Sequence, residues 1–143
     1  MAITVSLYNH TTQRFASGAN AIGDTYKLKL LTASTFNATH TTLAATGGTE
    51  VANGNGYTTG GATLTNVAVT TVTTNDAKFD ADDVTWTASG GSISANSAIL
   101  YDDTDGDDPP LLHIDFGGTE TAGDGTDFKV VWNSNGIVSF TTT

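Results

Sequence analysis

The chain contains no cysteine, and this absence removes several kinds of chemistry at once. Without thiols there are no disulfides, no thiolate zinc site, no cysteine nucleophile and no sulfur redox chemistry. The chain does not need cross-links to fold, because 143 residues can bury roughly two-thirds of the surface that the unfolded form exposes. We expect one domain, residues 1–143.

Basic residues are also scarce. Five Lys and Arg stand against 15 Asp and Glu, for a formal charge of −10. Such a surface repels nucleic-acid phosphates and anionic membranes. No apolar run approaches the ~20 residues that span a bilayer, and the amino terminus lacks the basic start and apolar core of a signal peptide. We expect a soluble chain with neither nucleic acid nor membrane as a partner.

The residues that favour exposed helices, Glu, Lys, Gln and Arg, are nearly missing, whereas Thr, Ala, Gly and Asp dominate. The 16 glycines, with many neighbouring Asn and Asp, supply the positive-φ turn positions that an antiparallel fold requires. At 38% hydrophobic residues, the chain is too apolar for a disordered acidic protein. The composition therefore predicts a compact all-β domain.

Apolar residues alternate with polar ones in several segments. Ile3, Val5 and Leu7 predict a strand with one buried face, and residues 26–30 predict another, with Lys27 and Lys29 facing water. Further strands are expected within 62–74, with a break near Asn66, and at 84–88, 98–101, 111–116, 128–132 and 137–140. Residues 98–101 are apolar on both faces, which favours a covered central strand.

The connections between these strands differ in kind. Residues 9–24 predict a long surface connection, 36–43 a short helical turn, and 47–61 a set of glycine-rich loops. A hairpin is expected around residues 102–110. A second is expected at residues 133–136, where Asn135-Gly136 is a strong two-residue turn signal. Together these patterns predict an antiparallel β-sandwich or jelly-roll-like domain of roughly eight or nine strands.

Five aspartates surround one glycine in residues 102–108. A bent loop could turn Asp103, Asp105 and Asp107 inward as oxygen ligands for Ca²⁺. The spacing does not match an EF-hand, because Gly106 comes too early and no glutamate follows at the required position. The main prediction is a solvated hairpin tip, with calcium as the alternative. The acidic groups within 76–83 and 120–127 are read as solvated loops.

Catalytic motifs are missing from the sequence. His10, His40 and His113 lack metal-ligand spacing, and there is neither a Gly-x-Ser-x-Gly elbow nor a phosphate-binding glycine loop. Paired carboxylates could serve a glycosidase, but no pair stands out and most aromatic residues lie on strand phases that predict core. We expect a protein that is not an enzyme and needs no cofactor.

The order of segments in the carboxyl half resembles a family of small virion structural proteins of tailed bacteriophages. The segments that show the likeness are 77–86, 98–102, 112–117, 120–128 and 132–137, joined in the amino half by 6–10 and 36–43. The likeness is one of overall pattern and spans nearly the whole chain, without a catalytic motif.

The resemblance implies a head decoration, or cement, protein. Such a protein would bind the outer surface of the phage head, bridge major capsid protein subunits and associate with itself as a dimer or trimer after synthesis in the host cytoplasm. The amino-terminal strand and residues 47–61 are the expected contact segments. Two alternatives stay open: a tail, head-completion or fibre-associated virion component, and a carbohydrate-binding β-sandwich.

Overall fold

The computed structural model describes residues 2–73 and 75–142. The chain is 45% strand and 8% helix, and every strand pairing in the described part is antiparallel, which confirms the all-β prediction. The elements are β1 (Thr4–Leu7), α1 (Thr11–Ser17), β2 (Tyr26–Ala33), α2 (Leu43–Thr46), β3 (Thr49–Glu50), β4 (Ala62–Thr63), β5 (Ala68–Thr73), β6 (Asp76–Asp80), β7 (Val84–Thr87), β8 (Ile93–Asp102), β9 (Pro110–Ala122), β10 (Asp127–Val130) and β11 (Val138–Phe140).

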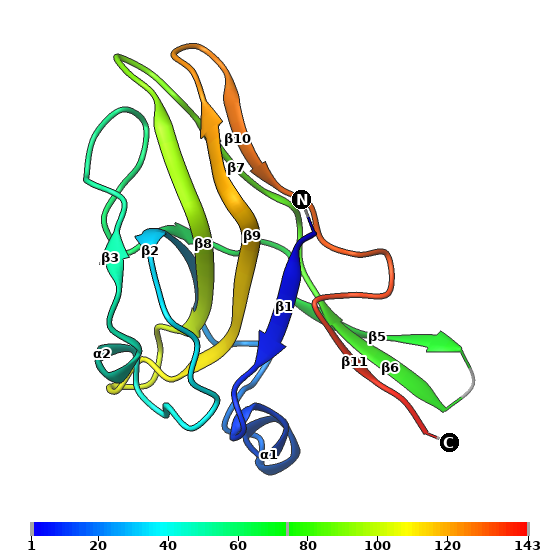
Figure 1. Cartoon of the computed structure of the whole chain (residues 1–143). Coiled ribbons are helices and arrows are strands. Elements are labelled where there is room, and N and C mark those ends of the chain that lie inside the picture. Colours follow the sequence, from blue (N-terminus) through cyan, green and yellow to red (C-terminus); the bar gives the residue numbers. More distant parts are fainter. Residues whose placement is uncertain (1, 74, 143) are drawn as a thin grey trace.

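Three sheets make up the described part of the molecule (Figure 1). The large sheet has the order β1-β9-β8-β2-β3, and β4 also pairs with β2. A two-stranded sheet, β10-β7, covers one face of it. The third sheet, β11-β6-β5, extends away from this body, at the lower right of Figure 1. The prediction of eight or nine strands missed β3, which has only two residues, and β6, whose segment was read as a solvated loop.

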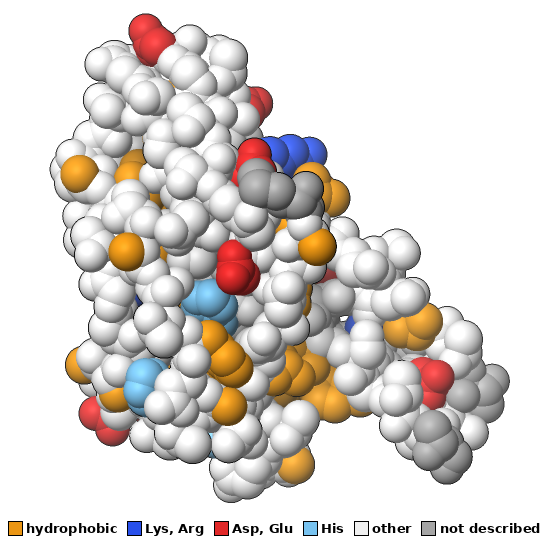
Figure 2. All heavy atoms as spheres, in the orientation of Figure 1, with side chains coloured by type: hydrophobic (Ala, Val, Ile, Leu, Met, Phe, Trp, Pro, Cys, Tyr) orange, Lys and Arg blue, Asp and Glu red, His pale blue; other side chains and the backbone are white. Residues whose placement is uncertain are grey.

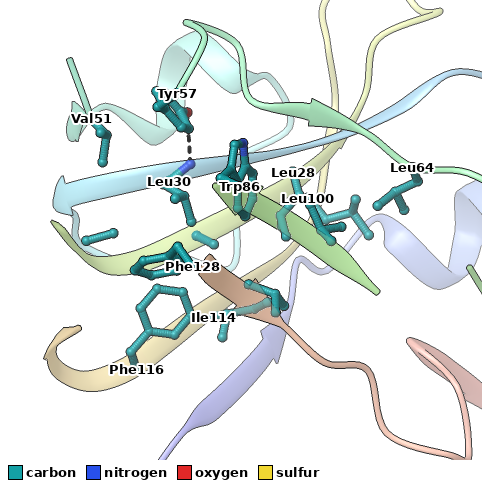
Figure 3. Packing of buried hydrophobic residues seen from close by; sticks show 14 of the residues in the cluster. Leu28, Leu30, Val51, Tyr57, Leu64, Trp86, Leu100, Ile114, Phe116 and Phe128 are labelled. Atoms are coloured by element: carbon teal, nitrogen blue, oxygen red, sulfur yellow. Dashed lines mark hydrogen bonds between the residues drawn. The ribbon is translucent and has the colours of Figure 1, made fainter. Parts of the chain in front are cut away.

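The main core lies between the large sheet and the β10-β7 pair (Figure 3). Leu30, Leu100 and Ile114 project from the large sheet, and Trp86 and Phe128 project from the covering pair. The expected covered strand is confirmed, because both faces of β8 are buried along 97–102. Its second face joins a smaller cluster made of Leu31, Ile99, Tyr101 and the partly buried Leu43. The segment around α2 covers this second face.

The glycine-rich segment 47–61 packs tightly against the body. Gly56 and Gly61 have positive φ angles of 92° and 87°, and a Cβ at either position would clash with the carbonyl of Thr87 or of Leu28. Between them Tyr57 is buried against the core. The expected loops are present, and glycine is required there because backbone lies directly against backbone.

The strand break at Asn66 is confirmed, because β4 and β5 are separate strands and Asn66 has a φ of 54°. The prediction for residues 9–24 was wrong in part, since this segment contains α1. The helix has no side-chain cap at His10 and depends on tertiary contacts. The Thr11 hydroxyl donates to the Leu111 carbonyl at 2.6 Å, and the ring of Phe15 lies 5.0 Å from that of Phe79. Such contacts leave no local sequence signal.

The helical turn expected at residues 36–43 was misplaced, because α2 begins at Leu43, after Thr42 accepts a hydrogen bond from the Ala45 amide. The last hairpin was also wrong. The turn exists, with a 2.8 Å bond from the Gly136 amide to the Asn133 carbonyl, but β10 pairs with β7 and β11 pairs with β6. The Ile137 amide bonds to Phe79, so the chain crosses here from one sheet to another.

Candidate functional site

The apolar face of β1 is exposed, although its alternation predicted a buried face. Ile3, Val5 and Leu7 are 66%, 55% and 38% exposed. The strand register places Val5 opposite Ile114 and Leu7 opposite Leu112, so these side chains share the core face of the large sheet. The covering β10-β7 pair has only two strands and does not extend over β1. The prediction of the strand is confirmed, and the prediction that this face is buried is wrong.

An open groove of about 700 Å³ runs along this side of the molecule, between the large sheet and β10. Core residues form its floor, so the groove continues the hydrophobic core to the surface. Its apolar lining comes from β1, β9, β10 and the segment leading to β11, and includes Ile3, Val5, Ile114, Phe116, Phe128, Val130, Val131, Trp132 and Ile137. We call this feature the open groove.

Two strand edges border the open groove. Among the described strands, β1 pairs only with β9, and β10 pairs only with β7. Within the described residues no further backbone hydrogen bond involves Thr4–Leu7 or Asp127–Val130. Figure 2 shows apolar side chains gathered near the lower end of β1 and continuing towards the junction with the third sheet. Unpaired backbone beside apolar side chains is what an added strand requires.

The acidic loop is held by basic side chains. Lys27 binds Asp103 at 2.8 Å, and Arg14 binds both Asp105 at 3.3 Å and the buried Asp102 at 3.4 Å. The Asp105 carboxylate also accepts the Asp107 amide at 3.3 Å. No group of three or more His, Asp or Glu side chains within 2–73 and 75–142 is arranged to hold a metal ion. Asp103 and Asp105 are thus paired with different basic side chains, Lys27 and Arg14. Calcium binding by this loop stays a prediction, which a titration with a chelator would test.

Asp102 differs from its neighbours in the loop because it is almost fully buried. Burial raises the pKa of its carboxyl, while the hydrogen bond from the Thr104 amide and the charge of Arg14 lower it. The Arg14 guanidinium is fixed in turn by Asn20, whose Oδ1 accepts from Nε at 2.9 Å. This ion pair joins α1 to the hairpin between β8 and β9, which is a structural role.

Ser34 and His113 form a pair that the sequence analysis missed, because they are 79 positions apart in the chain. They line a second, polar hollow of about 260 Å³ together with Ser97 and Asn96. Ser34 Oγ lies 2.8 Å from His113 Nε2 and 2.6 Å from Ser97 Oγ. A serine and a histidine in contact are the first two members of a hydrolytic triad.

The direction of the hydrogen bonds opposes that chemistry. Ser97 donates its only proton to Asn96 Oδ1 at 2.9 Å, an orientation fixed by the Asn96 Nδ2 bond to Thr32. Ser34 must then donate to Ser97 and accept from His113 Nε2. A histidine that donates through Nε2 does not take the serine proton. This arrangement ties β2, β8 and β9 together and gives Ser34 no general base.

The remaining polar residues singled out from the sequence lie apart. His10 contacts the Pro110 carbonyl at 2.7 Å, and neither residue lines the open groove. Asp80 pairs with Lys78 and Asp83 with Lys129, and Asp82 accepts from Thr65 and Asn66. The prediction of solvated loops was wrong for residues 76–80, which form β6, and for residues 120–122, which end β9. No described helix has the length and apolar character needed to cross a membrane.

Of these features, the open groove is the one whose apolar side chains and strand edges are not satisfied by contacts within the described chain. It has exposed apolar side chains and unpaired strand edges, whereas the acidic loop and the Ser34 network have partners within the chain. Comparison of the chain with models of known protein families, with curated proteins and with solved structures found no match.

Proposed function

We propose that this protein is a virion structural module without catalytic activity, which decorates the outer surface of a tailed-phage head and reinforces contacts between major capsid protein subunits. The phage context comes from the resemblance in segment order. The observation that supports a binding role is the open groove, where Ile3 and Val5 stay exposed on the core face of the large sheet. An apolar surface of this kind marks a site of protein association.

The physical basis of reinforcement is the burial of apolar area at many equivalent sites. Burying apolar surface contributes about 25 cal/mol per Å² as an upper guide, and the costs of association reduce what remains. Repetition over a lattice, with links between neighbouring copies, multiplies a modest contact into a stable layer. The charge of −10 would favour an outward-facing acidic surface away from packaged DNA.

The two contact segments expected from the sequence differ in accessibility. The amino-terminal strand is exposed and borders the open groove. In the segment 47–61, Val51 and Tyr57 are buried in the core, and two glycines lie against backbone. Of the two segments, β1 is therefore the one that a neighbouring molecule of the assembly, either a capsid subunit or a second copy of this chain, can contact.

Particle composition and stability test the proposal. Particles produced without this protein should assemble, yet should release DNA at lower temperature or under milder osmotic shock, because a bound clamp stabilises only the assembled shell. Adding the purified protein should restore resistance and saturate at a copy number set by the icosahedral lattice. A few copies confined to the tail or portal vertex would instead identify a tail or head-completion component.

A carbohydrate-binding role is the third alternative. Such modules use a row of exposed aromatic rings, but Tyr8, Tyr26, Tyr57, Trp86 and Tyr101 are all buried. This burial favours the structural role. Binding of the purified protein to a glycan panel would support the carbohydrate alternative and count against decoration.

A further inference from the structure

The third sheet, β11-β6-β5, forms an arm whose outer strand is exposed along most of its length. β5 pairs with β6 only, and no described residue completes its other edge. Five of its six residues are exposed, with Val69 at 47% and Val72 at 42%. Figure 1 shows the arm projecting clear of the body. β5 therefore presents unpaired backbone and apolar side chains to solvent.

Exposed strand edges are normally protected, and most edges of this protein are. β3 and β4 have two residues each, and β10 carries Asp127 and Lys129. Short length and charge both prevent unwanted pairing. β1 and β5, in contrast, have four and six residues and contain neither charged residues nor proline. β11 has only three residues. β7 also has an unpaired edge of four uncharged residues, but Gly56 lies directly against its backbone at the Thr87 carbonyl. Among the described strands, β1 and β5 are thus the longer edges that have neither charge nor covering backbone.

The charge of the chain indicates what can pair with these edges. Two copies, each with a formal charge of −10, repel one another over most of their surfaces. Contact between β1 of one copy and β5 of another buries no charged side chain of either strand, since both strands are free of Asp, Glu, Lys and Arg. Burying charges without partners costs far more than burying valine, isoleucine and threonine. Pairing of these two edges therefore avoids the cost of burying a charged side chain from either strand.

The open groove and the arm also lie next to one another. Ile137 lines the open groove, and the following residue, Val138, begins β11 of the arm. A two-fold axis beside this region could place each arm on the other copy's groove, which closes the assembly as a dimer. The same contact repeated around a different axis would close a ring.

We infer that β5 of one copy adds as a strand to the free edge of β1 in a second copy, with the valines of β5 against Ile3 and Val5 in the open groove. The large sheet of each copy is then extended by a strand from its neighbour, a mode of recognition in which backbone hydrogen bonds provide affinity and side-chain pockets provide register. This inference concerns contact between copies and does not depend on which particle the protein binds.

Charged variants test the contact. Val5→Lys on β1 and Val69→Glu on β5 each place a charge on one of the proposed partners, at positions exposed enough to keep the fold. Sedimentation velocity over a dilution series should show self-association of the wild-type protein, weakened by about tenfold or more in either variant. Ile22→Lys, at a residue 59% exposed outside both surfaces, is the matched control and should associate like wild type.

Mixing the two variants separates β1–β5 pairing from other contacts. In a mixture of the Val5→Lys and Val69→Glu proteins, the lysine of one copy faces the glutamate of the other, so association should recover. A wild-type protein that stays monomeric at the highest attainable concentration would overturn the inference. So would loss of association with Val5→Lys but not with Val69→Glu, which would mean that β1 pairs with itself.

Cross-linking tests the same contact without the charged variants, so its result does not depend on whether those variants are destabilised. Because the chain has no cysteine, Val5→Cys and Val69→Cys proteins each carry a single thiol. Mixed and oxidised, they should form a disulfide-linked pair in much higher yield than either does with an Ile22→Cys protein. Equal yields in the two mixtures would contradict the proposed contact. Decoration of a particle and association between copies are measured separately, so either proposal can fail alone.

Discussion

The hydroxyl of Tyr57 accepts a hydrogen bond from a backbone amide of the large sheet that has no partner strand at this position. Removing the hydroxyl tests how the glycine-rich segment stabilises the fold. On the outer side of β2, β4 pairs with Lys27 and Leu28, and β3 pairs with Leu31 and Ala33. The Leu30 amide lies between these short strands and donates to Tyr57 Oη at 3.0 Å (Figure 3). Tyr57 in turn donates to Glu50 Oε1 at 2.8 Å.

Tyr57→Phe keeps the buried ring and removes both the acceptor of the Leu30 amide and the donor to Glu50. Leu30 is fully buried, so its amide would have no water to replace the lost bond. An unsatisfied buried donor costs about 1–3 kcal/mol, whereas Glu50 keeps the Gly60 amide at 2.6 Å. We expect a loss of about 2 kcal/mol in the free energy of unfolding. For a chain of this length this lowers Tm by about 7 °C.

Urea and thermal unfolding of the variant measure this loss, and Tyr101→Phe is its control. Tyr101 is also buried, but its hydroxyl donates to the Gly60 carbonyl at 2.7 Å, and Gly60 is only partly buried. Water can satisfy that carbonyl, so we expect a loss of about 1 kcal/mol or less. A Tyr57→Phe protein no less stable than the Tyr101→Phe protein would refute the argument that the Leu30 amide depends on this hydroxyl.

Two further predictions concern single residues. Gly136→Val should destabilise by more than the ~0.5 kcal/mol of a typical surface change, because φ is 95° and a Cβ would lie 2.7 Å from that of Lys78; an unchanged Tm would contradict this. For His113, burial lowers the pKa below its ordinary 6.5, with the charge of Asp115 opposing. The unfolded chain then binds the proton more readily, so stability should fall as pH decreases below about 6.5. Urea unfolding between about pH 7.5 and about 5.5 should show a smaller decrease in His113→Gln.

Local sequence patterns predicted two kinds of feature correctly. These are strands that are buried on both faces and breaks in the alternation along a strand. Residues 98–101, apolar on both faces, proved to be central, and the slip at Asn66 proved to be a break between strands. The partners of strands were harder to predict. Asn135-Gly136 is a turn as expected, but whether its flanking strands pair depends on Phe79 and Asp83, which lie about fifty positions earlier.

The same limit explains what was missed around the candidate sites. α1 depends on Leu111 and Phe79, and the Ser34–His113 contact exists because β2 and β9 both flank β8. The regular register of β2 with β8 ends at Leu31 and Ser97, which brings Ser97 close to Ser34 just beyond β2. None of these contacts has a local sequence signal. The acidic loop was easy to find by composition, yet composition does not reveal that Lys27 and Arg14 form ion pairs with three of its five aspartates.

β1 shows what an alternating pattern does and does not determine. Period-2 alternation fixes which side chains share a face, and the register confirms that Val5 and Leu7 lie on the core face. It does not fix whether this chain supplies the layer that covers them. The β10-β7 pair ends before β1, so the exposure of Ile3 and Val5 is a property of the single chain. An amphipathic strand that is uncovered within its own chain, in a protein whose β5 edge is equally exposed, is the basis on which we propose that assembly covers this surface.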